Sequence, residues 1–363
     1  MYGRNEVRHS TIIIEALGKR LSTATPIQHE MWLISLDTFL TLYGKLGNNN
    51  VMDVHQDLKQ QNLLIQWQDV PSDGEIVFVS HEWLSWAHPD PEGHQLRVLC
   101  CALERLRDGK VNRVDMDPLH TIAYKHNFTT TRIEWQDMLR KTYLWIDWIS
   151  MPQPSADKYS NQTIAKLRAD SAKAIRSIPA YVERSDFILI LAPGCNHTDR
   201  NTSTCFRTWR RRGWCLLELF ASFMARDSTN PPLVIKSARG TPMWMSPLEI
   251  HKLSIGYSDF SCCQRNHVIT TETQKIMMND DEVKKIPCDR PIVKRVLKQL
   301  IDAKVNYLFN TSHDIMTARM FLCLKGWWLR GLHVVDSKNA DQMKEIHDLK
   351  TFKAQLRWEV HEK

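Results

Sequence analysis

The sequence predicts an α/β fold with a parallel sheet that is covered by helices, and three observations support this prediction. First, short apolar runs of strand length recur in the middle of the chain, at residues 75–80, 143–149 and 186–192. Second, segments with apolar residues at helical spacing follow these runs, at residues 94–107, 163–184 and 214–225. Third, these connections are long enough to return the chain to the same end of the sheet, as parallel strands require.

The composition indicates a folded chain with a hydrophobic core. Hydrophobic residues make up 43% of the 363 residues, a length that allows one large domain or two ordinary ones. Lys and Arg are interspersed with Asp and Glu, so the net charge of +7 is a mild excess. The sharpest local excess, residues 207–212, lacks the regular alternation with aromatic residues that is typical of single-strand nucleic-acid platforms. We therefore do not expect a nucleic-acid partner.

The cysteine content favours a reducing compartment. The nine cysteines are an odd number that includes two adjacent pairs, and the N-terminus does not resemble a secretory signal. No apolar run reaches the roughly 18 residues that a membrane span needs. We expect a cytoplasmic protein without a membrane partner, with the nucleus as the alternative compartment.

Residues 1–70 are predicted to form a helical extension. Two stretches with apolar periodicity, at 11–21 and 29–46, are separated by a segment with Pro26 and closed by Gly-Asn-Asn-Asn at 47–50. This extension contains no nucleotide-binding motif.

The first predicted strand, residues 75–80, ends beside side chains that can bind a ligand. A loop rich in Pro and aromatic residues, 81–93, follows at the carboxyl end of the strand, the edge where open α/β sheets bind ligands. Ser80, His81 and Trp83 can hydrogen-bond to a nucleotide or stack on its purine or nicotinamide ring. The alternative is that they pack the loop onto the sheet.

The second and third predicted strands differ in their role. Asp147, in the second strand at 143–149, can accept hydrogen bonds from a ribose or orient a neighbouring loop. Its alternative role is to brace the turn before Pro152 through its own backbone hydrogen bonds. The third run, 186–192, is apolar throughout, which is typical of a strand buried on both faces at the centre of a sheet.

The helix at 214–225 carries a single acid, Glu218. At 100° per residue its large apolar side chains fall on one side, while Glu218 lies opposite among small neighbours and Trp214. This arrangement leaves room for a ligand over the carboxylate, and the alternative is an ordinary solvent-facing glutamate. Arg212, in the arginine run before the helix, can favour an anion, or else belongs to a solvated loop.

Four blocks in this order resemble Toll/interleukin-1 receptor (TIR) homology domains. They are Phe78-Val-Ser-His81, Leu144-Trp-Ile-Asp147, Val182-Glu-Arg-Ser-Asp186 and Gly213-Trp-Cys-Leu-Leu-Glu218. Residues 143–153 also resemble the Leu-Trp-Ile-Asp-x-x-x-Ile-x-Gln signature of fungal heterokaryon-incompatibility domains, which have a related fold. The resemblance covers residues 72–230 and implies a flavodoxin-like parallel sheet in a TIR-like domain at 71–232.

This resemblance implies a signalling or defence protein of innate immunity that cleaves NAD at the nicotinamide–ribose bond. The essential glutamate of the enzymatic branch corresponds to Glu218, and NAD is then a substrate, so no cofactor is expected. The implied nucleotide-binding residues are Ser80, His81, Trp83, Asp147, Trp214 and Arg212. Long insertions at 110–140 and 194–208 depart from the family pattern. The alternative function is a non-enzymatic module that acts by self-association, because many TIR domains bind only one another.

The remaining chain is predicted as a mostly helical companion domain at 233–335 and a charged tail at 336–363. Clear helical patterns lie at 291–308 and 314–329. Cys262, Cys263, His267 and Cys288 could ligate a metal, but adjacent cysteines are awkward for one tetrahedral ion. Buried or turn cysteines are the default interpretation, so no metal is predicted.

Overall fold

The computed structural model describes residues 25–47, 49–118, 121–122, 128–154, 161–225, 231–246, 254–268 and 286–332. The chain divides into two compact units. The first consists of Met1–Arg210 with Glu218–Lys252, and the second of Arg211–Leu217 with Leu253–Lys363. The predicted helix at 11–21 and the predicted tail at 336–363 lie outside the described residues. Among the described helices, none has the length and apolar character that a membrane crossing needs.

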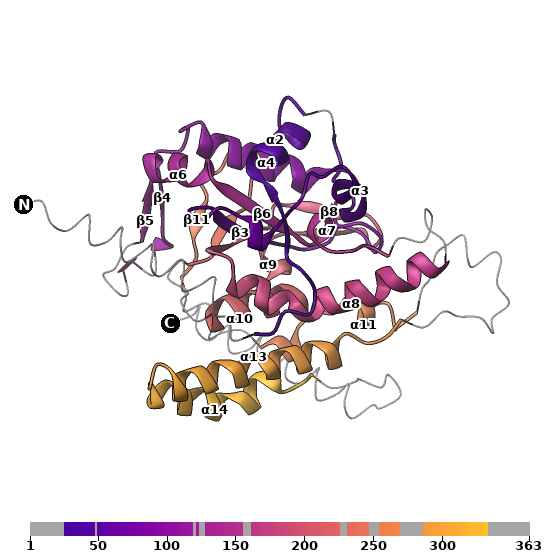
Figure 1. The fold of residues 1–363 in the computed structure, drawn as a ribbon, viewed down its shortest axis with the longest axis vertical. Coiled ribbons are helices and arrows are strands. Elements are labelled where there is room, and N and C mark those ends of the chain that lie inside the picture. Colours follow the sequence, from indigo (N-terminus) through magenta and orange to yellow (C-terminus); the bar gives the residue numbers. More distant parts are fainter. Residues whose placement is uncertain are drawn as a thin grey trace, which may run out of the picture. The chain divides into compact units, whose positions relative to one another are not determined.

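The first unit is built on a seven-stranded, mostly parallel sheet (Figure 1). Its strand order is β11-β10-β7-β3-β6-β1-β2. The four central strands run parallel, and β1, β2 and β11 pair antiparallel at the two edges. The strands are β1 (Trp32–Ser35), β2 (Ile65–Gln66), β3 (Glu75–His81), β6 (Thr142–Ile146), β7 (Phe187–Leu191), β10 (Leu233–Ile235) and β11 (Met243–Trp244).

The prediction of an α/β fold is confirmed, and three details differ from the expectation. The second strand ends at Ile146, because Asp147 begins a short helix. β1 and β2 lie in the sheet although they fall within the helical extension predicted over 1–70, and β10 and β11 lie in the sheet although they fall beyond the boundary predicted at 232. Strands of two to four residues give too short a period-2 signal to stand out from neighbouring apolar segments. β3, rather than β7, is the middle strand.

Helices cover both faces of this sheet (Figure 1). α2, α4 and α6 lie on one face, where alternate residues of the strands, such as Val77, Leu144 and Leu189, join their apolar side chains in one core. α8 lies on the other face, where Tyr181 contacts Trp145 and Trp145 stacks on Phe78 at 4.2 Å between ring centroids. The helices are α2 (Leu36–Tyr43), α3 (His55–Gln60), η1 (Trp67–Asp69), α4 (His94–Arg107), α6 (Arg132–Leu139), α7 (Asp147–Ser150), α8 (Asn161–Glu183) and α9 (Phe206–Trp209).

The two insertions that depart from the family pattern contain small hairpins. The first holds β4 (Arg113–Asp115) paired with β5 (Thr129–Thr131), followed by α6. The second holds β8 (Cys195–His197) paired with β9 (Thr202–Thr204), followed by α9. Both insertions therefore add elements outside the central sheet.

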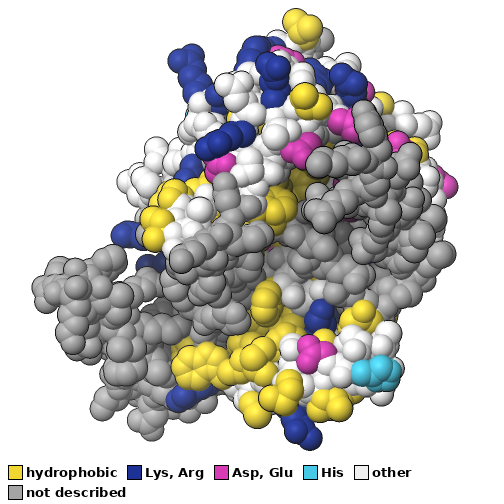
Figure 2. All heavy atoms as spheres, turned by 90° about the vertical axis from the view of Figure 1, so that its left-hand side faces the viewer, with side chains coloured by type: hydrophobic (Ala, Val, Ile, Leu, Met, Phe, Trp, Pro, Cys, Tyr) yellow, Lys and Arg dark blue, Asp and Glu magenta, His cyan; other side chains and the backbone are white. Residues whose placement is uncertain are grey.

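The second unit is helical in its described part, whereas the start of the region predicted as a helical domain, 233–335, contributes β10 and β11 to the sheet of the first unit. α13 (Arg290–Asn310) and α14 (Ile315–Leu329) pack side by side as a helical hairpin (Figure 1). The buried guanidinium of Arg290 donates to the carbonyl oxygens of Gly256 and Gly331, which ties the start of α13 to both flanking loops. Exposed hydrophobic side chains gather on this hairpin, which is seen at the bottom of Figure 2. The shorter helices are η4 (Ile255–Tyr257) and α11 (Ser261–Gln264), and α10 (Gly213–Met224) contributes residues to both units.

Candidate functional site

The candidate site begins at the carboxyl end of the middle strand. β3 and β6 are parallel neighbours, so their ends bring Ser80, His81 and Asp147 to the same edge of the sheet. Because side chains alternate along a strand, Ser80 and His81 point to opposite faces. Ser80 reaches Glu218 in α10 on one face, and His81 reaches Gln95 in α4 on the other.

Ser80 joins the predicted catalytic acid to the sheet. Its hydroxyl donates to Glu218 Oε2 at 2.5 Å and accepts a hydrogen bond from Trp209 Nε1 at 3.1 Å. Ser80 and Trp209 are buried, with 1% and 0% of their surfaces exposed, whereas Glu218 is half-buried. The buried hydroxyl group of Ser80 thus holds one oxygen of the Glu218 carboxyl group in place.

The environment of Glu218 favours its neutral form. Burial raises the pKa of Glu218 to about 8, and the negative charge of Asp147 adds to this effect. The hydrogen bond from Ser80 and the charge of His81 act in the opposite direction but do not compensate for burial. At neutral pH most molecules therefore carry a protonated Glu218, which ionises just above that pH.

His81 is held as a cation by its two hydrogen-bond acceptors. Gln95 donates its amide Nε2 to the carbonyl oxygen of Glu82 at 2.8 Å, which turns its Oε1 toward His81 Nδ1 at 2.9 Å. The other ring nitrogen, Nε2, lies 2.9 Å from Asp147 Oδ1. Both nitrogens consequently act as donors, the state of an imidazolium ring. Burial lowers the pKa of His81, but the Asp147 carboxylate and these hydrogen bonds outweigh it and raise the pKa to about 9.

Asp147 accepts hydrogen bonds from several donors around it. Besides His81, it accepts hydrogen bonds from Trp83 Nε1 at 2.7 Å and from the backbone N–H of Trp148 at 2.6 Å. Burial raises the pKa of Asp147, but the charge of His81 and the donated hydrogen bonds outweigh it and place the pKa below its usual range. Asp147 is therefore an ionised partner of His81.

The segment with the heterokaryon-incompatibility signature forms a turn at Asp147 that two hydrogen bonds stabilise. Ser150 Oγ accepts from the backbone N–H of Ile146 at 3.1 Å, and Gln153 Nε2 donates to the carbonyl oxygen of Asp147 at 3.0 Å. These bonds fix the backbone from which the Asp147 side chain projects. The predicted role of Asp147 in the turn thus has contacts in the structure, and its binding of a ribose stays a prediction.

The site consists of a buried layer of residues and a more accessible layer. Ser80 and His81 are almost fully buried, while Trp83, Asp147 and Glu218 are half-buried. Chemically, the accessible layer offers two carboxyl groups of different protonation state and one indole ring. Two acids whose environments push their pKa values apart are the pattern of a site that handles protons or developing positive charge.

Two of the predicted nucleotide-binding residues make their described contacts elsewhere. Trp214 Nε1 donates to Asp289 at 3.1 Å within the second unit. Arg212 donates to Ser261 Oγ and, at 3.3 Å, to Gln264 Oε1 in the same unit. The structure therefore brings together five of the predicted site residues, namely Glu218, Ser80, His81, Asp147 and Trp83. The other two, Trp214 and Arg212, form hydrogen bonds with residues after the predicted α/β domain.

Sequence reasoning missed a third acid beside the site, and this one is fully buried. Glu82 is 4% exposed; it accepts a hydrogen bond from Thr208 Oγ1 at 2.6 Å and lies 3.4 Å from Arg200 Nη2. Both partners belong to 194–208, which at the level of sequence stands out only as a long insertion. The adjacent His-Glu pair after a buried strand was the available signal, since a charged group so close to the sheet needs a partner.

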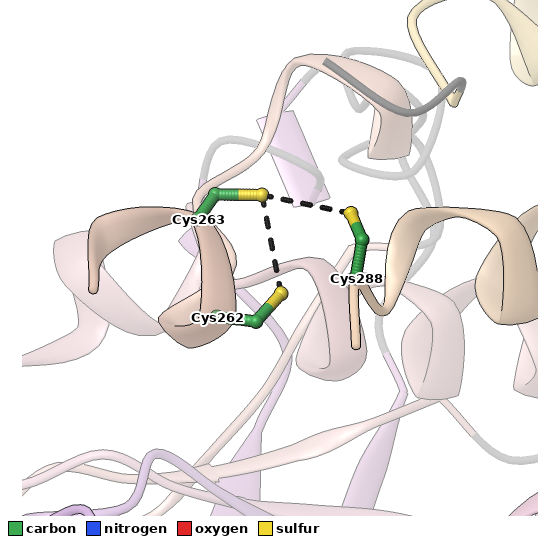
Figure 3. Close-up of side chains that lie close together, drawn as sticks. All are labelled: Cys262, Cys263 and Cys288. Atoms are coloured by element: carbon green, nitrogen blue, oxygen red, sulfur yellow. Dashed lines mark hydrogen bonds between the residues drawn. The ribbon is translucent and has the colours of Figure 1, made fainter. Parts of the chain in front are cut away.

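The cysteine set considered for metal binding is partly assembled in the second unit. The sulfur atoms of Cys262, Cys263 and Cys288 all lie within 4.8 Å of one another (Figure 3). Cys263 is 3.9 Å from each of the other two. His267 does not belong to this group, although its backbone N–H donates to the carbonyl oxygen of Cys262 at 2.8 Å.

Comparisons with protein-family models, with curated proteins and with solved structures find no match to this chain. The function must therefore be argued from the geometry of the site.

Proposed function

We propose that this chain is a TIR-like signalling or defence protein that hydrolyses NAD at the nicotinamide–ribose bond, with Glu218 as the carboxylate at the ribose. The observation that carries the proposal is the contact between Glu218 and Ser80 at the carboxyl end of the middle strand. It links the Trp-Cys-x-x-Glu helix to the Ser-His strand end, two blocks of the resemblance that lie far apart in the sequence.

The order of the parallel strands supports a flavodoxin-like core. Counted along the chain, β3, β6, β7 and β10 are the first to fourth parallel strands, and their spatial order is 2-1-3-4. A flavodoxin-like sheet has the order 2-1-3-4-5, and its ligand binds at the carboxyl end where the first strand meets the third. Ser80 and His81 end the first of these strands, and they pair with Ile190 and Leu191 of the third.

The chemistry of the site suits a substrate with a positively charged leaving group. In the proposed reaction the bond between ribose C1′ and the pyridinium nitrogen breaks, and its electron pair leaves with nicotinamide. Water then adds at C1′ and loses a proton. An ionised Glu218 would stabilise the positive charge that develops at C1′ or orient the ribose hydroxyl groups. Ser80 would hold one oxygen of this carboxylate in place.

The His81–Asp147 pair would shape the pocket edge rather than react. Asp147 accepts the Trp83 indole N–H and so fixes a half-buried aromatic ring next to the strand end. Such a ring can stack on nicotinamide or adenine. With His81 cationic and Asp147 ionised, this pair contributes no net charge, which leaves Glu218 to respond to the charge of the substrate.

The test is nicotinamide release from NAD by the purified full chain at high protein concentration, with and without a crowding agent. Glu218→Gln is expected to reduce release at least ~100-fold, the effect of removing one group that stabilises transition-state charge. The matched control is Glu92→Gln, which removes an exposed carboxyl group outside the cluster. Because the carboxylate form is required, release by the wild type should rise with pH, with its midpoint at about pH 8.

Release that is equal in the wild type and the Glu218 variant would contradict the assignment of the site. Absence of release, together with absence of NAD binding by calorimetry and concentration-dependent self-association, would favour the non-enzymatic module instead.

A further inference from the structure

The second unit contains a cluster of sulfur atoms that the proposed NAD chemistry does not use. Cys262 and Cys263 lie in the short helix α11, and Cys288 comes just before the long helix α13. Figure 3 shows that all three side chains point toward one another from these two segments. All three are free cysteines, of which Cys262 is buried and the other two are half-buried, so the cluster brings three partly shielded thiol groups together.

The spacing of the sulfur atoms matches that of ligands around one metal ion. Two of the three separations are 3.9 Å, and all are below 4.8 Å. With zinc–sulfur bonds of about 2.3 Å, the sulfur atoms at the corners of a tetrahedron lie ~3.8 Å apart. A disulfide requires a separation of about 2.05 Å, so the observed spacing corresponds to ligands of a shared ion and not to a bonded pair.

We propose that Cys262, Cys263 and Cys288 bind one zinc ion, which links α11 to the start of α13. Thiolates are soft donors that select zinc or monovalent copper over hard cations such as Mg²⁺ and Ca²⁺. Three neighbouring thiolates repel one another unless a cation lies between them, and a divalent ion offsets most of this charge. The proposal is independent of the NAD reaction, because every ligand belongs to the second unit.

The adjacency of Cys262 and Cys263 argued against zinc at the level of sequence, and the local backbone removes this objection. α11 is only four residues long, and Asp289 N–H donates to Cys262 Sγ at 3.3 Å from the start of α13. This contact brings Cys288 to the side of α11 where both neighbouring thiols lie (Figure 3). The N-terminal end of α13 also favours negative charge, which suits thiolates.

His267 is the candidate for the fourth ligand. Its backbone is hydrogen-bonded to Cys262, and its buried Nδ1 atom has no hydrogen-bond partner among the described residues. Three cysteines and one histidine form a common structural zinc set. If His267 does not turn toward the ion, water takes the fourth position.

The first experiment measures metal content and metal binding of the full chain, purified under reducing conditions. We expect about one zinc per chain, and thiolate-to-cobalt charge-transfer absorption when Co²⁺ replaces zinc. Cys288→Ser should lower zinc affinity on the order of 100-fold or more, measured by competition with a chromophoric chelator. Cys323→Ser is the matched control, because Cys323 is an exposed cysteine of the same unit outside the cluster.

The His267→Ala variant separates the two forms of the fourth position. A loss of zinc affinity on the order of tenfold or more would identify His267 as a ligand, and unchanged affinity would indicate water. Wild-type protein with titratable thiols that binds neither zinc nor Co²⁺ through sulfur would overturn the proposal. Selective binding of monovalent copper, or a disulfide among the three cysteines in the freshly purified chain, would also overturn it. The wild-type measurements do not depend on any variant being folded.

Discussion

Replacement of Glu218 by glutamine should change how the stability of the first unit depends on pH. The pKa of this carboxyl group is about 8 in the folded protein, compared with an ordinary value of 4.5. Between these two pH values the folded state holds a proton that the unfolded state has released. The free energy of unfolding therefore falls as pH rises, by ~1.4 kcal/mol per pH unit for one proton. A glutamine side chain does not titrate, so the variant lacks this loss.

Between pH 5 and 6.5 the difference between the two proteins isolates the effect of Glu218, because the buried histidine His55, whose lowered pKa also affects stability there, is common to both. His81 has a raised pKa of about 9, and it also reduces stability as pH rises, but only above the unfolded pKa of 6.5. The lowered pKa of Asp147 affects stability only in more acidic solution. Across this window the wild type should lose ~2 kcal/mol relative to Glu218→Gln, and somewhat less to the extent that solvent screens the half-buried group.

Thermal unfolding followed by tryptophan fluorescence, in matched buffers from pH 5 to 8.5, measures this difference. A relative change of ~1–2 kcal/mol corresponds to roughly 2–8 °C in Tm. The gap between the variant and the wild type should widen with pH and become constant above about pH 8. Parallel curves would refute the argument that burial holds Glu218 in its neutral form. Glu92→Gln should follow the wild-type curve throughout.

Two further substitutions test the packing around the site and in the second unit. Ser80→Ala leaves the Glu218 carboxyl group and a buried indole N–H without their shared partner, so we expect a loss of ~1–3 kcal/mol in unfolding free energy. It should also move the pH-dependent stability change of Glu218 to higher pH, because the serine hydrogen bond lowers that pKa. Gly213→Ala places a Cβ atom in steric overlap with the ring of Phe260 and should cost about 1–3 kcal/mol. Gly194→Ala, where no atom lies within 4 Å of the added Cβ, should stay within about 0.5 kcal/mol of the wild type in the same denaturation assay.

The parts of the fold that the sequence could predict are those with a long or uninterrupted pattern. β7 is apolar throughout, β3 contains the uninterrupted apolar run 76–79, and α4 and α13 keep one buried stripe over several turns, so the bounds of these elements agree closely with expectation. β1 and β10 could not be recognised, because each is short and owes its place to pairing with β6 or β7. Edge pairing is a long-range property that local periodicity does not encode.

The residues of the candidate site also divide into those that the sequence could predict and those that it could not. Ser80, His81 and Asp147 could be predicted because parallel strands bring their carboxyl ends to one edge of the sheet. Their partners Gln95 and Trp209 could not, since each comes from a helix whose rotation and depth depend on packing. The sequence also placed Trp214 beside Glu218 one helical turn away, but it gave no sign that the indole is engaged by Asp289.

The charge states of His81, Asp147 and Glu218 explain how two carboxyl groups can lie at the same edge of the sheet. His81 and Asp147 neutralise each other through a direct hydrogen bond, and Glu218 avoids an uncompensated charge by keeping its proton. A bound ligand that carries a positive charge would stabilise the ionised form of Glu218 and so lower the pKa of this carboxyl group. Binding of such a ligand would then release a proton below about pH 8 and create the carboxylate beside the ligand itself. The neutral acid of the free protein and the carboxylate that the proposed NAD hydrolysis requires would thus be two states of one site, and the charge of the proposed substrate would select between them.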